Sequence, residues 1–467
     1  MAQTALDKPL CHFGANPWTL RAACEGVQIF GATGSGKTSG SGLAIARTFL
    51  EQGFGGLVLT AKPEDSDLWL TYCAQTGRSR DLLILAPDAP YRFNFITYEH
   101  QRADAGGGLT ENLVNLFTRA IEAVTNHAQA SGDSYWIEAP RQLLRNAIDT
   151  LSLSGSPVTL PNIKRLIDEA PRSSEDARSP AWQETSLFAD CFAKLARTQA
   201  AGSSVASPPE LELAIRYWTT EFPGLSDKTR ASIISSFTAM ADPLLRGVLH
   251  TLFCTETNFR PEDSFNGRII LLDLPLKQFG VAGRAAQILF KSLWQDAAER
   301  RPRREDTRPV FLWADEAQYF LTSTDPLFQQ TARSARVCTV YLTQNLSNYY
   351  LALGRADAKH YVESLLGNLT TKIFHANDHI ETNRFAAELI ARNWAMRRSM
   401  TVSENANSSA SLSPALDYQL LPSAFQSLRR GGPSDDYQVD AILFRGGVDW
   451  GTSGKNYLRV SFDQRGA

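Results

Sequence analysis

The sequence lacks the features that mark membrane-spanning, exported and disulfide-rich proteins. No apolar run approaches the ~20 residues that a transmembrane helix needs. The N-terminus has no basic segment followed by an apolar one, as a signal peptide would. None of the six cysteines stands in the CxxC spacing of a zinc or redox site. We therefore expect reduced cysteines in a cytoplasmic protein with no transmembrane segment of its own.

An excess of charge of one sign is also missing. Lys and Arg number 47 and Asp and Glu number 49, which gives a formal net charge of -2. The chain is therefore not a polycation built to coat nucleic acid, and any DNA contact must come from a local patch. The rest of the composition, 43% hydrophobic and 21% charged over 467 residues, is typical of a globular protein of two or three domains.

Short apolar runs alternate with helical patterns at both ends of the sequence. This order predicts an α/β fold with a mainly parallel sheet covered by helices. The expected early strands are 26–30, 55–60 and 82–85, with a helix over 37–52. The expected late elements are strands at 268–274, 310–314, 337–342, 371–375, 438–444 and 457–462, and a helix over 282–300.

The middle of the chain has helical periodicity and no convincing strand. We therefore expect residues 106–251 to form an all-α domain, inserted between two parts of one α/β domain, 1–105 and 252–467. Near the end of the chain, the Ser- and Asn-rich segment 399–413 predicts a flexible loop.

A phosphate-binding loop follows the first expected strand. The segment fits G-x-x-x-x-G-K-[ST], and it lies between an expected strand and an expected helix, which is the context that gives this pattern meaning. Backbone N–H groups of such a loop ring a polyphosphate, the lysine reaches the β/γ oxygens, and the threonine hydroxyl ligates Mg²⁺. The residues are Gly31, Ala32, Thr33, Gly34, Ser35, Gly36, Lys37 and Thr38.

Two acids follow the apolar strand 310–314. Asp315 is the expected magnesium acid, and Glu316 is the expected general base that orients the attacking water. By itself an apolar run followed by two acids fits a pair at a helix N-terminus equally well. Together with the phosphate-binding loop, it predicts the second half of a nucleotide site.

Two further residues are candidates on weaker patterns. Gln344 follows the strand 337–342 and is expected to sense the γ-phosphate, although a glutamine there can also simply cap a turn. Arg333 lies in an expected helical stretch and could stabilise transition-state charge in a neighbouring subunit. An ordinary surface arginine is the competing interpretation.

Taken together, these motifs resemble one family. The residues that carry the resemblance are GATGSGKT at 31–38, TAKPE at 60–64, FLWADEAQYF at 311–320, ARSARVCTVYLTQN at 332–345 and the LRRGG segment at 428–432. They resemble the type IV secretion coupling proteins of the TraD/TraG kind, a branch of the FtsK/HerA-like P-loop ATPases. This chain departs from the family in having Thr60 where an Asp is common and in lacking the N-terminal membrane helices.

The resemblance implies a RecA-like fold, ATP and Mg²⁺ as cofactors, and a homo-hexameric motor that moves DNA or a DNA–protein conjugate for conjugative transfer. It further implies Lys37, Glu316, Gln344 and Arg333 in catalysis. The implied partners are single- or double-stranded DNA, which itself could trigger hexamer assembly, and a relaxase or a secretion-channel component. The implied location is cytoplasmic, or peripheral at the inner membrane where a partner holds the protein there.

Evidence for DNA contact in the sequence itself is limited to two arginine clusters. Residues 300–304 are a basic run that is also typical of a solvated connector. The second cluster, Arg392, Arg397 and Arg398, surrounds Trp394, which could stack on a base. Two alternative functions stay open: a cargo-docking adaptor ATPase for protein substrates, and a DNA translocase or helicase of genome maintenance or defence.

Overall fold

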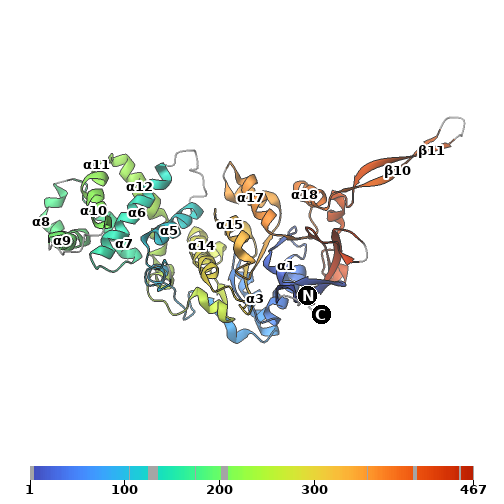
Figure 1. Cartoon of the computed structure of the whole chain (residues 1–467), viewed down its shortest axis with the longest axis horizontal. Helices are drawn as coiled ribbons and strands as arrows, with labels where there is room; N and C mark the ends of the chain where they lie inside the picture. The colour runs from blue at the N-terminus through green and yellow to red at the C-terminus, as the bar shows by residue number, and fades with distance from the viewer. Residues whose placement is uncertain are drawn as a thin grey trace.

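The structure is a computed structural model that describes residues 5–104, 106–124, 135–173, 175–200, 209–354, 356–402, 408–451 and 454–465. The described chain is elongated (Figure 1). A helical region occupies one end, an α/β body the middle, and a long hairpin the opposite end. No helix among these residues is long and apolar enough to cross a membrane.

A nine-stranded sheet forms the centre of the described part. Strands β3 to β9 run parallel, and β12 joins β9 antiparallel, so the predicted α/β fold with a mainly parallel sheet is confirmed. The order across the sheet is β13 (Tyr457–Asp463), β12 (Gln438–Arg445), β9 (Thr371–Phe374), β3 (Val27–Phe30), β8 (Val337–Thr343), β7 (Val310–Ala314), β4 (Gly55–Leu59), β6 (Ile269–Leu272) and β5 (Leu82–Leu85).

Alternate residues of the central strands enter two different cores, because side chains of a strand alternate between the faces of a sheet. In β7, for example, Phe311 and Trp313 pack into one core and Leu312 into the other. One face is covered by α1 (Leu20–Cys24), α2 (Leu43–Glu51) and α3 (Pro63–Gln75). The other face packs against α14 (Leu276–Arg300), α15 (Asp325–Ala332), α16 (Leu346–Leu353), α17 (Ala358–Asn368) and α18 (Ile380–Ile390).

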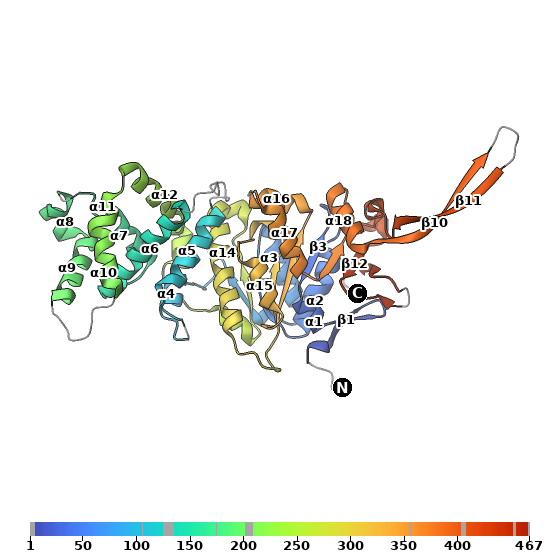
Figure 2. The same ribbon diagram turned by 45° about the horizontal axis from the view of Figure 1, so that its top comes forward.

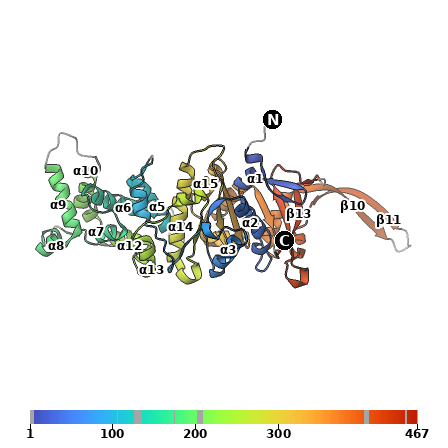
Figure 3. The same cartoon turned by 90° about the horizontal axis from the view of Figure 1, so that it is seen from below.

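The described residues between β5 and β6 form helices joined by loops, and none of these residues belongs to a strand. Helix α14 lies between this region and the sheet (Figure 3) and packs along α5. The division at residues 106 and 251 stays a prediction, since the apolar core runs continuously from the sheet into α5. The helices are α4 (Phe95–His100), α5 (Thr110–Val124), α6 (Tyr135–Leu153), α7 (Leu160–Asp168), α8 (Pro180–Thr185), α9 (Leu187–Ala200), α10 (Pro209–Arg216), α11 (Phe222–Gly224), α12 (Asp227–Leu244) and α13 (Gly247–Phe253).

The predicted loop at 399–413 is wrong for the residues that the structure describes. Strands β10 (Arg392–Val402) and β11 (Ser408–Tyr418) pair antiparallel over eleven residues each and project from the body (Figure 2). Residues 403–407 lie outside the described part. Serine and asparagine suggested a loop, but the regular cross-strand pairing of the backbone outweighs their low strand propensity. A second pair, β1 (Pro9–Phe13) and β2 (Asn16–Thr19), was also not predicted.

Candidate functional site

The phosphate-binding loop connects β3 to the turn that leads into α2. Gly34 and Gly36 have φ values of 70° and 78°, a region that side chains other than glycine rarely adopt. A Cβ at Gly36 would lie 2.5 Å from Val439 of β12. A helical turn at Thr38–Gly42 precedes α2, so the helix expected over 37–52 begins with a wider turn. Glycine is therefore required at position 36 both by the positive φ and by the close packing against Val439.

The loop fits a polyphosphate. The side chain of Ser35 is fully buried, and its hydroxyl has no hydrogen-bond partner in the structure. Lys37 is only 8% exposed. A buried hydroxyl without a partner costs free energy unless a ligand supplies one. Phosphate oxygens would supply it, and the residues that would hold the phosphates and the magnesium ion are Ser35, Lys37, Thr38 and Asp315.

The two acids lie beside this loop. The Thr38 hydroxyl donates to Asp315 Oδ2 at 2.9 Å, across 277 positions of sequence. Because β3 and β7 run parallel to β8, which lies between them, their carboxyl ends meet at one edge of the sheet. A threonine hydroxyl and a carboxylate in contact are the pair that Mg²⁺ of a P-loop site uses.

Glu316 is buried and held by three donors. Its Oε1 accepts from Lys62 Nζ at 2.7 Å and from Gln344 Nε2 at 3.2 Å, and its Oε2 accepts from Gln318 Nε2 at 2.9 Å. Burial acts to raise the pKa of Glu316, but the hydrogen bonds from Lys62 and Gln318 and the positive charges of Lys37 and Lys62 outweigh it and hold the pKa below its usual value. The residue has φ 51°, in the left-handed region, a strained backbone of the kind that collects at functional sites.

Gln344, which follows β8, joins this cluster, and its role as a phosphate sensor stays a prediction. Its amide reaches Glu316, and its backbone carbonyl accepts from Asn377 Nδ2 at 2.8 Å. Asn345, the next residue, caps α16. Gln344 thus contacts Glu316 through its side chain and Asn377, which follows β9, through its backbone.

Arg333 lies apart from the other predicted residues. It follows α15 and precedes β8, so it is at the amino edge of the parallel strands, opposite the phosphate-binding loop. Its guanidinium contacts Glu25 at 3.2 Å and is half exposed. It therefore does not reach the nucleotide site of its own chain, and a role in a neighbouring subunit stays a prediction.

Three residues of the site had no role assigned from the sequence. Lys62 and Gln318 contact Glu316, and His375, which directly follows β9, contacts Ser41 in the turn that precedes α2. Position at the carboxyl end of a parallel strand could have indicated Lys62 and His375. Thr60 is used within the sheet, since its hydroxyl donates to the Leu272 carbonyl at 2.7 Å.

His375 contacts the helical turn that follows the phosphate-binding loop. Burial lowers its pKa to about 3, so the ring is neutral. Nδ1 lies 3.1 Å from the Asp440 carbonyl, which can only accept, so Nδ1 carries the proton. Nε2, at 2.7 Å, then accepts from the Ser41 hydroxyl. The imidazole thus connects the turn Thr38–Gly42 to the antiparallel strand β12.

Comparisons with known proteins bear on the fold of the chain. No protein-family model matches the chain, and no curated protein matches it. Solved structures do match: the bacterial conjugative coupling protein TrwBdeltaN70 in its unbound monoclinic form has a TM-score of 0.63 and 15% identity, over 99% of this chain and 90% of that chain. TrwB with the non-hydrolysable ATP analogue ADPNP has a TM-score of 0.63 and 14% identity, over 99% of this chain and 89% of that one. TrwB with ADP and Mg²⁺ has a TM-score of 0.63 and 15% identity over the same shares. The chain therefore has the fold of the coupling protein TrwB, a RecA-like P-loop fold with a helical region, over almost its whole length.

Proposed function

We propose that the chain is a P-loop ATPase that uses hydrolysis to move DNA, or a DNA–protein conjugate, as a motor of the type IV coupling-protein type. One observation carries the proposal: Thr38, Asp315, Glu316 and Gln344 meet at one sheet edge through hydrogen bonds, beside a loop with a buried, unpartnered hydroxyl. TrwB, which shares the fold, is a plasmid coupling protein solved with an ATP analogue and with ADP and Mg²⁺.

Each residue of the site has a separate role in the proposed hydrolysis. Loop amides and Lys37 hold the phosphates in line for attack. Thr38 and Asp315 would hold a magnesium ion, which would neutralise negative charge on the phosphates. Glu316 orients the attacking water and accepts its proton. Gln344, in contact with Glu316, responds to whether the terminal phosphate is present.

Two substitutions test the site. Lys37→Ala is expected to abolish ATP turnover by weakening binding, since it removes the cation that contacts the β/γ oxygens. Glu316→Gln is expected to leave ATP bound and to lower turnover by about 10²–10⁴-fold, which is the typical contribution of a general base. Phosphate release and calorimetric ATP binding measure the two effects separately. Full turnover by Lys37→Ala would show that the site is assigned wrongly.

Arg333 is proposed to act in trans, in a homo-hexamer. Its position at the opposite edge of the sheet and its half-exposed guanidinium are compatible with contact to a neighbour. Mixing Arg333→Ala subunits with Lys37→Ala subunits tests this, because some interfaces in the mixed ring then combine the intact loop of one subunit with the intact arginine of its neighbour. Partial recovery of turnover in the mixture supports the trans role, and no recovery contradicts it.

DNA is the proposed substrate, and a relaxase or a secretion-channel component the proposed protein partner. Two arginines of the basic run 300–304 are engaged internally: Arg300 pairs with Asp104, and Arg301 donates to the Ala335 carbonyl. On the hairpin, Arg397 pairs with Asp417, while Trp394 is 71% exposed. Mass in solution with ATP and DNA, together with DNA-stimulated phosphate release, tests both assembly and substrate.

A second candidate function, a cargo-docking adaptor ATPase, is favoured by a cavity in the helical region. It has a volume of about 600 Å³ and is lined by aromatic side chains that include Trp182, Phe188, Phe192 and Trp218. The two indole N–H groups are already bonded, to the Glu169 carbonyl and the Thr150 hydroxyl, so the walls offer apolar surface. An adaptor would be stimulated by a protein and would ignore DNA.

A further inference from the structure

Lys62 lies where the chain leaves β4 and enters α3. Its backbone is fixed by Asp65, whose carboxylate accepts from the N–H groups of Ala61 and Lys62, each at 2.9 Å. The side chain takes no part in that cap and extends to Glu316 instead. Substituting the side chain therefore leaves the start of α3 intact.

The ion pair joins a half-exposed lysine to a buried acid. The Lys62 side chain is 38% exposed and that of Glu316 is 4% exposed, at a distance of 2.7 Å. Of the three donors on Glu316, Gln318 and Gln344 are neutral amides, so Lys62 supplies the one full charge among them. Because both oxygens of the buried Glu316 carboxylate accept hydrogen bonds, and one of these comes from a charged donor, the carboxylate has a defined orientation.

We propose that Lys62 is a positioning residue for hydrolysis, which acts through Glu316. The inference rests on the proposed ATPase function. A bound triphosphate brings negative charge to the edge of the sheet where Glu316 lies, and like charges repel strongly where water is excluded. Lys62 opposes that repulsion and keeps the carboxylate directed at the attacking water. A displacement of about 1 Å at such a group costs about 10²-fold in rate.

A competing role for Lys62 is direct contact with the phosphates. The two roles differ in what they do to nucleotide affinity. A phosphate ligand contributes to binding in the ground state, so its loss weakens the affinity for nucleotide. A residue that acts through Glu316 lowers the maximal rate, leaves affinity nearly unchanged, and has little left to contribute once Glu316 is replaced.

The test combines Lys62→Met with Lys62→Arg, each in the wild-type chain and in the Glu316→Gln chain. Turnover is measured by phosphate release, and affinity by calorimetry with a non-hydrolysable ATP analogue. Lys277→Met is the matched control, because Lys277 is an exposed lysine at the start of α14, which follows β6 at the same edge of the sheet. Its turnover and affinity are expected to equal those of the wild type.

Lys62→Met is expected to lower kcat about 10²-fold and to change analogue affinity less than about threefold. Lys62→Arg is expected to recover about tenfold of the loss, because a charged donor to the carboxylate remains. In the Glu316→Gln chain, Lys62→Met is expected to have almost no further effect on the residual rate, since both substitutions remove the same function.

Several results would overturn the proposal. Turnover that stays unchanged or rises in Lys62→Met contradicts it, and so does a loss of analogue affinity greater than about tenfold, which identifies a phosphate ligand. An equal loss in the wild-type and Glu316→Gln chains also contradicts it. If Lys62→Met does not fold, Lys62→Gln carries the same test. A wild-type chain that binds no ATP refutes the proposed function itself, and this inference with it.

Discussion

At the scale of single residues, two buried lysines of this fold differ in the group that accepts their hydrogen bonds: a carboxylate for Lys291 and a backbone carbonyl for Lys372. Lys291 and Asp325 are fully buried and paired at 2.6 Å, with further bonds from Gln295 and Tyr341 to the carboxylate. Lys372 of β9 is buried to 5% exposure, and its ammonium donates to the Leu369 carbonyl at 2.8 Å. Burial lowers the pKa of Lys372 to about 8 from its ordinary 10.5. A carbonyl is a weaker partner for an ammonium than a carboxylate, so the charged form of Lys372 is destabilised by folding.

Lys372→Met is therefore expected to raise the free energy of unfolding at pH 7 by about 1–3 kcal/mol, less than the full shift because the Leu369 carbonyl loses its donor. Between the folded pKa of about 8 and the ordinary value of 10.5, the unfolded state holds more protons than the folded state. The free energy of unfolding of the wild type therefore rises as pH rises through this range, and the difference in stability between the variant and the wild type shrinks.

Chemical denaturation of both proteins at pH 7, 8, 9 and 10 measures this difference. Lys359→Met is the control, since Lys359 is exposed and pairs only loosely with Glu363 at 4.0 Å. A stability difference between wild type and Lys372→Met that does not vary with pH would contradict the assignment of the buried charge.

At the scale of elements, the phosphate-binding loop depends on a strand that follows it by about four hundred positions. Gly36 packs against Val439 of β12, and Gln464, just after β13, donates to Ser39 at 2.7 Å. Asp440 of β12 accepts from Arg429, Arg459 and Ser461. The antiparallel strands β12 and β13 and the residue that follows them thus pack against the loop and the turn after it.

Gly36→Ala is expected to lower the free energy of unfolding by about 1–3 kcal/mol and to weaken nucleotide binding, because the residue is strained and its Cβ meets Val439. Gly77→Ala is the matched control: Gly77 has a similar φ of 70°, but a Cβ there would meet nothing within 4 Å. Denaturation and calorimetry compare the two. Wild-type nucleotide binding by Gly36→Ala would show that the contact with β12 does not determine the conformation of the loop.

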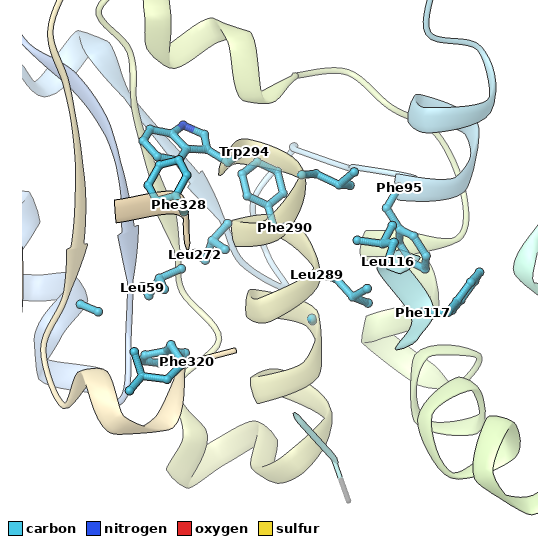
Figure 4. Close-up of a cluster of buried hydrophobic side chains, with 14 of the residues drawn as sticks. Leu59, Phe95, Leu116, Phe117, Leu272, Leu289, Phe290, Trp294, Phe320 and Phe328 are labelled. Atoms are coloured by element: carbon cyan, nitrogen blue, oxygen red, sulfur yellow. The ribbon is translucent and has the colours of Figure 1, made fainter. Parts of the chain in front are cut away.

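At the scale of the whole molecule, one apolar core joins the sheet to the helical region. Figure 4 shows Leu59 and Leu272 of the sheet, Leu289 and Phe290 of α14, and Phe117 of α5 in one continuous cluster. Phe117 also packs edge-on against Phe95 and Phe237 at centroid distances of 5.8 and 6.1 Å. The helical region is therefore joined to the α/β body by buried side chains and not only by its two chain connections.

Phe117→Ala is expected to cost about 3–5 kcal/mol of unfolding free energy, the usual loss for a fully buried phenylalanine. Leu351→Ala on α16 is the control, since Leu351 is 83% exposed and its loss should change stability by less than about 0.5 kcal/mol. Denaturation followed by tryptophan fluorescence and by circular dichroism measures both variants. Equal stability of the two would contradict a shared core.

Nucleotide binding should also stabilise the whole molecule. At a concentration about 1,000 times its dissociation constant, ADP with Mg²⁺ is expected to add about 4 kcal/mol to the free energy of unfolding, because only the folded chain has the site. The increase should be absent in Lys37→Ala. Thermal unfolding with and without nucleotide measures it, and an equal shift in both proteins would show that binding occurs elsewhere.

Much of the site could be predicted because its residues follow local rules. The loop pattern between a strand and a helix, and acids after a fully apolar strand, depend on short-range geometry and on the common edge of parallel strands. The hairpin of β10 and β11 could not be predicted in this way, since its stability comes from pairing between two segments whose composition favours a loop.

The sequence by itself determined the α/β class, the loop of residues 31–38, and the acids and the glutamine that meet beside it, because each is encoded by a contiguous pattern. Only the tertiary structure decided that Lys62 holds Glu316, that β12 packs against Gly36, and that Arg333 lies at the far edge of the sheet. These are contacts between distant segments, and their distances depend on strand order and packing, which no local pattern specifies.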